Sequence, residues 1–137
     1  MTPTLTVAEY MTPSPHTVGR AQPLRTARHM MQKLRVRHLP VLDGGKLIGM
    51  LSDRELGAAE SLPGADLLKV EEAMSPTTYM VTPEAPLDAV AREMAELKVG
   101  SAVVMHGPTV LGVFTAVDGL RALADALSGS GPAGHHG

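Results

Sequence analysis

The stretch GMLSDREL at residues 49–56 has a counterpart, GVFTAVDG, at residues 112–119, which lies 63 residues later in the chain. Both stretches begin with glycine, continue with two apolar residues and a hydroxyl residue, and reach a carboxylate three positions further on. A glycine at such a place in a strand indicates that a side chain would be unwelcome there. The hydroxyl and carboxylate pairs, Ser52 with Glu55 and Thr115 with Asp118, have the spacing of a capping box. The pattern therefore predicts a strand that runs directly into a helix, twice.

The repetition extends well beyond these two stretches. Shifting the chain by 63 residues aligns residues 7–56 with residues 70–119 without a gap, and thirteen of the fifty columns are identical. Self-similarity at a fixed spacing is typical of a repeated structural unit. The alignment predicts two copies of one fold.

Each copy shows the same order of local signals. Thr6 and Glu9 have capping-box spacing and predict a short helix, which Pro13 ends. Val18 lies in a short extended piece. Apolar residues three or four apart predict a helix from Pro23 to about Arg35. Two strands at 38–42 and 47–51, joined by a DGGK hairpin turn, precede a helix from Ser52 to roughly Ala59. The predicted fold class is therefore α/β, with two β-α-β-β-α repeats.

The repeats suggest a domain plan. We expect a first repeat at residues 1–60, a connector at 61–69, a second repeat at 70–127 and a disordered Gly-rich tail at 128–137. A unit of about fifty residues buries little core alone. We therefore expect the repeats to pack sheet to sheet about a pseudo-twofold axis, which would create two equivalent clefts.

Composition excludes several classes of function. The net charge is −2 and there is no cysteine, which weighs against nucleic-acid binding and excludes disulfides, thiolate chemistry and cysteine-ligated zinc. The six histidines form no H-x-x-x-H pair, so no metal site is predicted. The first residues do not have the pattern of a signal peptide, and no run approaches the roughly 18 to 20 apolar residues of a membrane span. We expect a cytoplasmic protein.

The segments RHLPVLDGGKLIGMLSDREL (37–56) and GSAVVMHGPTVLGVFTAVDGL (100–120) resemble the cystathionine-β-synthase-type domain, or CBS domain. Two such domains in tandem resemble a Bateman module, and the resemblance covers about residues 7–127. It implies a stand-alone, non-catalytic sensor whose regulatory ligand is AMP, ADP, ATP or S-adenosylmethionine. It also implies an associated enzyme, channel or transporter, and a homodimer shaped as a flat disc. The expected dimer face includes Met30, Met31, Met94 and Leu97.

The resemblance also implies roles for individual residues. Ser52 and Thr115 would contact phosphate, and Glu55 and Asp118 would contact ribose hydroxyls. A helix N-terminus independently favours phosphate. The second copy follows the family pattern, whereas the first has Glu in place of Asp. The resemblance further implies phosphate contacts for Arg37 and His38 and room for a ligand at Gly100. Around adenine it implies His16, Thr17, Val36, Tyr79, Met80 and Val99.

Simpler interpretations remain open. The hydroxyl and carboxylate pairs could serve only as helix caps, and Arg37 could be a solvated charge at a helix end. The chain could also be a structural or protein-interaction module with decayed nucleotide pockets. An enzyme or a DNA-binding regulator is the third alternative, although the sequence shows neither a nucleophile with a matching base nor a basic stripe.

Overall fold

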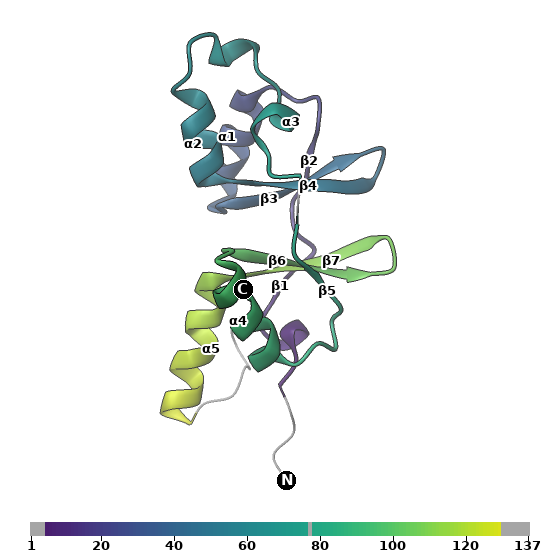
Figure 1. Ribbon diagram of the computed structural model, residues 1–137, viewed down its shortest axis with the longest axis vertical. Coiled ribbons are helices and arrows are strands. Elements are labelled where there is room, and N and C mark those ends of the chain that lie inside the picture. Colours follow the sequence, from purple (N-terminus) through teal and green to yellow (C-terminus); the bar gives the residue numbers. More distant parts are fainter. Residues whose placement is uncertain (1–4, 77, 130–137) are drawn as a thin grey trace. The chain divides into compact units, whose positions relative to one another are not determined.

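The computed structural model describes residues 5–76 and 78–129 and divides them into two compact units (Figure 1). Residues 16–76 and 78 form one unit from an almost uninterrupted segment, which we call the continuous unit. Residues 5–15 and 79–129 together form the other, which we call the split unit. Each unit has its own sheet and its own hydrophobic core.

The continuous unit contains a three-stranded sheet with the order β2-β3-β4. Strand β2 pairs parallel with β3, and β3 pairs antiparallel with β4. Helix α1 packs on β3, α2 packs on β4, and the two helices contact each other. The elements are β2 (Val18–Gly19), α1 (Leu24–Leu34), β3 (His38–Asp43), β4 (Lys46–Ser52), α2 (Asp53–Glu60), the 3-10 helix η2 (Ala65–Leu67) and α3 (Val70–Ala73).

The split unit repeats this plan with one further strand. Its sheet has the order β1-β7-β6-β5, in which β1 and β7 are antiparallel, β7 and β6 are antiparallel, and β6 and β5 are parallel. Helix α4 packs on β6 and α5 on β7. The elements are the 3-10 helix η1 (Val7–Glu9), β1 (Thr12–Pro13), β5 (Met80–Val81), α4 (Leu87–Leu97), β6 (Ser101–His106), β7 (Thr109–Thr115) and α5 (Ala116–Ser128).

The predicted β-α-β-β-α order is confirmed in both copies, and local chemistry explains the boundaries. Helix α1 follows Pro23 and ends at Arg35, which adopts a left-handed conformation with φ of 56°. Helix α4 ends in the same way at Lys98. The hairpin turn between β3 and β4 uses Gly44 and Gly45 with φ of 56° and 84°, a conformation that glycine adopts without steric cost. Both hairpins also have a shift in strand register at equivalent positions, between Val41 and Leu42 in β3 and between Val104 and Met105 in β6.

The opening segment of each repeat packs on the other repeat, which the sequence did not predict. In the split unit, the Val7 N–H donates to the carbonyl of Ala85 at 2.9 Å, and β1 pairs with β7. In the continuous unit, the Val70 N–H donates to the carbonyl of Gln22 at 2.8 Å. The compact units and the sequence repeats therefore do not coincide.

The hydrophobic cores show the same exchange. Val7 and Val70 occupy equivalent positions in the repeats and are both fully buried. Val7 belongs to the core of the split unit, with Tyr10 and Phe114. Val70 belongs to the core of the continuous unit, with Leu39 and others. Each core is thus completed by a residue from the start of the other repeat.

The repeated glycine is required by this exchange. A Cβ atom at Gly49 would lie 2.6 Å from the Met74 sulfur and 2.6 Å from the Ser75 carbonyl oxygen. At Gly112 it would lie 2.5 Å from the Met11 sulfur and 2.8 Å from the carbonyl oxygen of Thr12. Backbone atoms of the exchanged segment leave no space for a side chain. The expectation that a side chain would be unwelcome is confirmed.

The ends of the expected elements need one correction. The tail was expected to begin at residue 128, but Ser128 still belongs to α5, and Gly129 caps the helix with φ of 76°. The remainder of that tail, residues 130–137, lies outside the described residues. Within the part of the chain that is described, no helix combines the length and the apolar character needed to cross a bilayer.

The expected dimer face also needs correction. Met31 and Met94 are only 4% and 6% exposed, because each side chain lies in the core of its own unit. Met30 is partly buried against the core of the continuous unit. Of the four residues expected at the dimer face, only Leu97 is well exposed.

Candidate functional site

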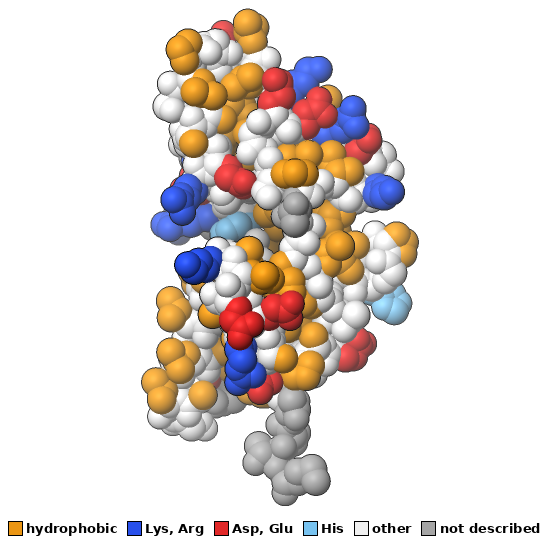
Figure 2. All heavy atoms as spheres, in the orientation of Figure 1, with side chains coloured by type: hydrophobic (Ala, Val, Ile, Leu, Met, Phe, Trp, Pro, Cys, Tyr) orange, Lys and Arg blue, Asp and Glu red, His pale blue; other side chains and the backbone are white. Residues whose placement is uncertain are grey.

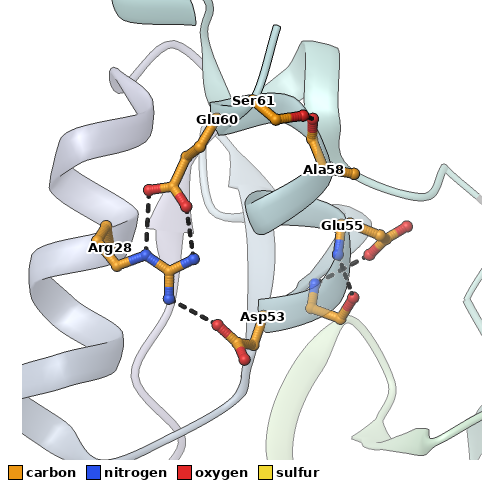
Figure 3. A network of polar contacts seen from close by, with 7 residues as sticks. Arg28, Asp53, Glu55, Ala58, Glu60 and Ser61 are labelled. Carbon is orange, nitrogen blue, oxygen red and sulfur yellow. Dashed lines mark hydrogen bonds and ion pairs between the residues drawn. The ribbon is translucent and has the colours of Figure 1, made fainter.

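The two strand-to-helix junctions are reciprocal capping boxes, as the spacing predicted. At the N-terminus of α2, the Glu55 N–H donates to Ser52 Oγ at 3.1 Å, and the Ser52 N–H donates to Glu55 Oε1 at 2.9 Å (Figure 3). At α5, the Asp118 N–H donates to Thr115 Oγ1 at 3.3 Å, and the Thr115 N–H donates to Asp118 Oδ2 at 2.9 Å. Each hydroxyl and carboxylate pair is therefore held at the start of its helix.

The two carboxylates differ in their surroundings. The Asp118 side chain is only 5% exposed. Its Oδ2 atom accepts hydrogen bonds from both the backbone N–H and the hydroxyl of Thr115, and its Oδ1 atom pairs with Arg121 at 3.4 Å. Glu55 is half-buried. The split unit therefore presents the more tightly positioned carboxylate.

Cationic side chains adjoin the junction of the continuous unit. His38, the first residue of β3, pairs in register with Ser52. The carbonyl of the exposed Arg37 accepts a hydrogen bond of 2.8 Å from the Asp53 N–H. Arg37 and His38 therefore adjoin Ser52 through the backbone, and their contact with phosphate stays a prediction. A hydrogen bond from Arg28, together with the charges of Arg28, Arg37 and His38, lowers the pKa of Asp53.

An ion-pair network ties α1 to α2 beside this junction (Figure 3). The Arg28 guanidinium contacts Asp53 Oδ1 at 2.6 Å and Glu60 Oε1 at 2.6 Å, and its Nε donates to Glu60 Oε2 at 3.1 Å. Hydrogen bonds to these two carboxylates raise the pKa of Arg28. Sequence analysis missed this network, because the three residues lie in two helices and no local motif links them.

The junction of the split unit lacks the matching cations. Gly100 and Ser101 stand where the continuous unit has Arg37 and His38. The carbonyl of Gly100 accepts a hydrogen bond of 3.0 Å from the Ala116 N–H, and Ser101 pairs in register with Thr115. The backbone geometry of the two junctions is therefore the same, whereas their charge differs.

Two of the residues expected around adenine, Val36 and Val99, directly precede Arg37 and Gly100 in the sequence. Tyr79 donates from its hydroxyl to Glu93 Oε2 at 3.1 Å, and burial followed by this hydrogen bond raises the pKa of Tyr79. Met80 in β5 is 56% exposed. His16 is exposed, whereas Thr17 and Val36 are partly buried. Val99 is 38% exposed.

The thirteen expected site residues sort cleanly between the units. The continuous unit holds His16, Thr17, Val36, Arg37, His38, Ser52 and Glu55, and the split unit holds Tyr79, Met80, Val99, Gly100, Thr115 and Asp118. Their contact with a ligand stays a prediction. Among residues 5–76 and 78–129, no group of three or more His, Cys, Asp or Glu side chains is arranged to hold a metal ion.

Comparison with known proteins assigns this arrangement to a family. A family model described as "CBS domain" matches residues 7–59 and 70–125. No curated protein shows a significant match.

Solved structures resemble the chain over nearly its whole length. A candidate acetoin utilization protein (AcuB) from Vibrio cholerae is 33% identical, with a TM-score of 0.81 and coverage of 92% of this chain and 95% of that one. CBSX2 in complex with AMP is 26% identical, with a TM-score of 0.76 and coverage of 89% and 98%. The CBS domain pair of MJ0100, in complex with 5-methylthioadenosine and S-adenosyl-L-methionine, shares the fold at 24% identity, with a TM-score of 0.82 and coverage of 90% and 99%.

Proposed function

Because the chain belongs to the CBS domain family, we propose that it is a regulatory module that binds an adenosine-containing ligand such as AMP, ADP, ATP or S-adenosylmethionine. The observation that carries the proposal is the junction between β7 and α5, where Thr115 and Asp118 stand at a helix N-terminus. The similar protein CBSX2 has been solved with AMP. The proposal gives the chain no catalytic role of its own.

The chemistry of this junction suits a nucleotide. The N-terminus of α5 carries a partial positive charge, which favours phosphate, and the Thr115 hydroxyl adds a polar group beside it. Both Oδ atoms of Asp118 can accept hydrogen bonds. Oδ2 is engaged by Thr115, so a ribose hydroxyl would approach Oδ1. Oδ1 pairs with Arg121 at 3.4 Å, and the Arg121 side chain is 52% exposed.

The continuous unit supplies a second junction of different charge. Arg37, His38 and Ser52 would attract phosphate, whereas Glu55 replaces the shorter carboxylate. We therefore expect ribose recognition at Asp118 and stronger phosphate attraction at Arg37. At the junction of the continuous unit, Val36 would contribute apolar contact to adenine with His16 and Thr17 beside it, and at the junction of the split unit Val99, Tyr79 and Met80 would do the same.

Regulation would follow from a shift in population. A ligand that binds one conformation of the module better than another favours that conformation, and a partner enzyme or transporter responds to it. Ligand affinity and partner affinity must then be coupled in both directions.

A second function is favoured by the capping geometry. In both junctions the hydroxyl and the carboxylate already satisfy backbone N–H groups of the helix. Capping explains both residue pairs without a ligand. A protein-interaction module with no nucleotide site would show the same contacts.

The deciding experiment measures binding of AMP, ADP, ATP, GTP and S-adenosylmethionine by thermal shift and by titration calorimetry. A ligand at about one hundred times its dissociation constant should stabilise the protein by roughly 2.7 kcal/mol. We expect an adenosine compound to bind and Asp118→Asn to weaken it at least tenfold. The matched variant Glu55→Gln, at the equivalent position, should have a smaller effect.

Two results would decide against nucleotide binding. One is the absence of any shift or heat with all five compounds at millimolar concentration. The other is an equal loss of affinity in Asp118→Asn and in a variant remote from both junctions, such as Leu67→Gln. Circular dichroism of each unliganded variant separates loss of the cap from loss of binding, because capping changes stability even without ligand.

A further inference from the structure

Helix α1 carries basic side chains along its exposed side, which we call the α1 row: Arg25, His29 and Lys33. All three are exposed, and they follow one another at intervals of four residues. At 3.6 residues per turn, such a row turns through only about 80° and is about 12 Å long. The buried residues Leu24 and Met31 lie on the opposite side of the helix. The α1 row therefore faces away from the core of its own unit.

Nothing in the described part of the chain pairs with the two charged members of the α1 row. The side chains of Arg25 and Lys33 take part in no hydrogen bond or ion pair among residues 5–76 and 78–129. Arg28, on the same helix, is instead engaged by two carboxylates of α2. Residues 16–42 contain six Lys or Arg and no Asp or Glu. The positive charge of the row is therefore available to another molecule.

The equivalent helix of the second repeat reverses these charges. At the offset of 63 residues, Arg25 and Lys33 correspond to Asp88 and Glu96 of α4, and both carboxylates are exposed. Figure 2 shows Asp and Glu side chains over the position that α4 has in Figure 1. Because the two repeats share one fold, the fold itself does not require a positive row on this helix.

Helix stability does not explain Arg25 either. Arg25 is the second residue of α1, which has no acidic residue in its first turn. A helix N-terminus carries a partial positive charge and favours a carboxylate, which α4 supplies with Asp88. Lys33 in the last turn agrees with the helix dipole, whereas Arg25 opposes it. An exposed arginine that is unfavourable for its own helix points to a contact outside the chain.

We propose that the α1 row is a docking surface for an acidic helical segment of a partner protein. A helix with Asp or Glu at every fourth position presents carboxylates with the same spacing as Arg25, His29 and Lys33. Opposite charges arranged in this way speed the encounter of two proteins and fix the register of their contact. Arg35 and Arg37, which are both exposed, extend the positive surface beyond the end of α1.

The distribution of charge favours a short acidic segment over other polyanions. The α1 row is shorter than the basic stripe of a nucleic-acid-binding protein, which follows many phosphates. The segment of the second repeat that aligns with residues 16–42, residues 79–105, has four Asp or Glu and two Lys or Arg, so the positive surface does not continue there. A helix that binds an anionic membrane has exposed apolar side chains beside its cations, whereas the exposed residue between His29 and Lys33 is Gln32.

Fluorescence anisotropy with a synthetic peptide tests the proposal. The probe is a fluorescein-labelled helical peptide with glutamate at every fourth position in an alanine background, and the protein is the full chain. We expect binding that weakens as salt is added, because exposed charges are screened beyond about 10 Å at 0.1 M salt. The reversed variant, Arg25→Asp with Lys33→Glu, should bind at least tenfold more weakly. It has the residues that α4 has at the same positions, and circular dichroism checks that it is folded.

The matched control is Lys46→Glu with Arg92→Glu. It changes the net charge equally, at exposed positions outside the α1 row, and should weaken peptide binding far less than the reversed variant. The proposal is overturned if the peptide does not bind, if its binding does not depend on salt, or if both variants weaken binding equally. The assay contains no nucleotide, so its failure would leave the proposed function untouched.

Other occupants of the α1 row would be identified by the same reversed variant. A single-stranded oligonucleotide, or a vesicle that contains phosphatidylserine, overturns the proposal if it binds more tightly than the peptide and loses affinity in the reversed variant. Sedimentation equilibrium tests for a second copy of the chain. Salt-dependent self-association that is lost in the reversed variant would assign the row to the acidic helix α4 of that copy, and would equally overturn the partner segment.

Discussion

Tyr10 connects the start of the chain to its last described helix. Its side chain is only 4% exposed, and its hydroxyl donates to Asp125 Oδ2 at 2.5 Å. Burial, followed by this hydrogen bond and by the negative charges of Asp125 and Glu9, raises the pKa of Tyr10 to about 12. The equivalent residue of the second repeat is Ala73, so this contact exists in the split unit alone.

The raised pKa of Tyr10 predicts a loss of stability in alkali. Between pH of about 10 and about 12 the unfolded phenol loses its proton while the folded one keeps it. The folded state then binds more protons than the unfolded state, so the free energy of unfolding should fall as pH rises through this window. Thermal unfolding as a function of pH measures the effect.

The two tyrosines of the chain can be titrated separately. In Tyr79→Phe, the ultraviolet absorbance of tyrosinate reports Tyr10 alone and should rise only near pH 12. In Tyr10→Phe, the decline in stability above pH 10 should be smaller, and what is left would come from Tyr79, whose pKa is also raised. An ordinary titration near pH 10 in Tyr79→Phe would contradict the buried hydrogen bond.

At the scale of elements, a glycine in each hairpin lets another segment of the chain pack closely against the strand. The repeated Gly49 and Gly112 lie within β4 and β7, beside Ser75 and Thr12. The predicted strands were correct, but a strand prediction alone does not reveal what lies against the strand. The repeated glycine indicated that another part of the chain packs closely against the strand, but not which part.

Gly112→Ala should therefore destabilise the protein by about 1–3 kcal/mol, because the new methyl group meets the Thr12 carbonyl oxygen and the Met11 sulfur. Gly57→Ala is the matched control, since Gly57 lies in α2 with open space around the Cβ position. There alanine should stabilise the helix by about 1 kcal/mol. Urea unfolding of both variants measures the difference, and equal effects would contradict the crowded glycine.

Helix α2 is held to α1 by a side-chain network that has no counterpart in the split unit. Arg28 and Asp53 align with Ala91 and Ala116. Arg28→Gln should return the pKa of Asp53 toward its ordinary value. In the unmodified protein, the lowered pKa of Asp53 stabilises the folded state above the ordinary pKa of aspartate. This stabilisation is lost as pH falls through the pKa of Asp53 in the folded state. The variant lacks this contribution, so its free energy of unfolding should fall less on acidification.

NMR titration of the Asp53 carboxyl carbon checks this expectation. The exposed residue Arg25 lies on the same helix, and Arg25→Gln serves as the control, because it removes an equal charge without touching Asp53. The effect on stability near neutral pH should be small, since the partners are partly exposed and screened by solvent. An unchanged Asp53 pKa in Arg28→Gln would contradict the network.

At the scale of the whole molecule, the two sequence repeats exchange their opening segments. Val7 opens the first repeat but lies in the core of the split unit, and Val70 opens the second repeat but lies in the core of the continuous unit. The first residues of each repeat therefore pack against residues of the other repeat. This arrangement joins the two halves of the sequence by packing and hydrogen bonds as well as by the covalent chain.

The exchange predicts a crossed pattern of destabilisation. Val7→Ala should reduce hydrogen-exchange protection at residues 79–129, and Val70→Ala should reduce it at residues 16–76, each by about 2 kcal/mol of local stability. Both valines are fully buried, so each variant is the control for the other. Mass spectrometry of exchanged peptides measures the pattern, and reduced protection within the same sequence repeat would contradict the exchange.

The residues alone determined the repeat, the order of its strands and helices, the capping boxes and the hairpin turn. These features depend on contacts within a few residues, such as Ser52 with Glu55 or Gly44 with Gly45, and on apolar spacing within one element. The sequence also indicated which residues could form a site. It could not show that the opening segment of each repeat completes the core formed mainly by the other repeat.

Tertiary structure decided the remainder. The exchange of opening segments, the buried pair of Tyr10 and Asp125, and the network around Arg28 join residues between 25 and 115 positions apart. The expectation that Met31 and Met94 face a partner was wrong for the same reason, because helical spacing identifies an apolar side but not what covers it. Only packing showed that these methionines are covered by their own unit, whereas the leucines of α5 remain exposed.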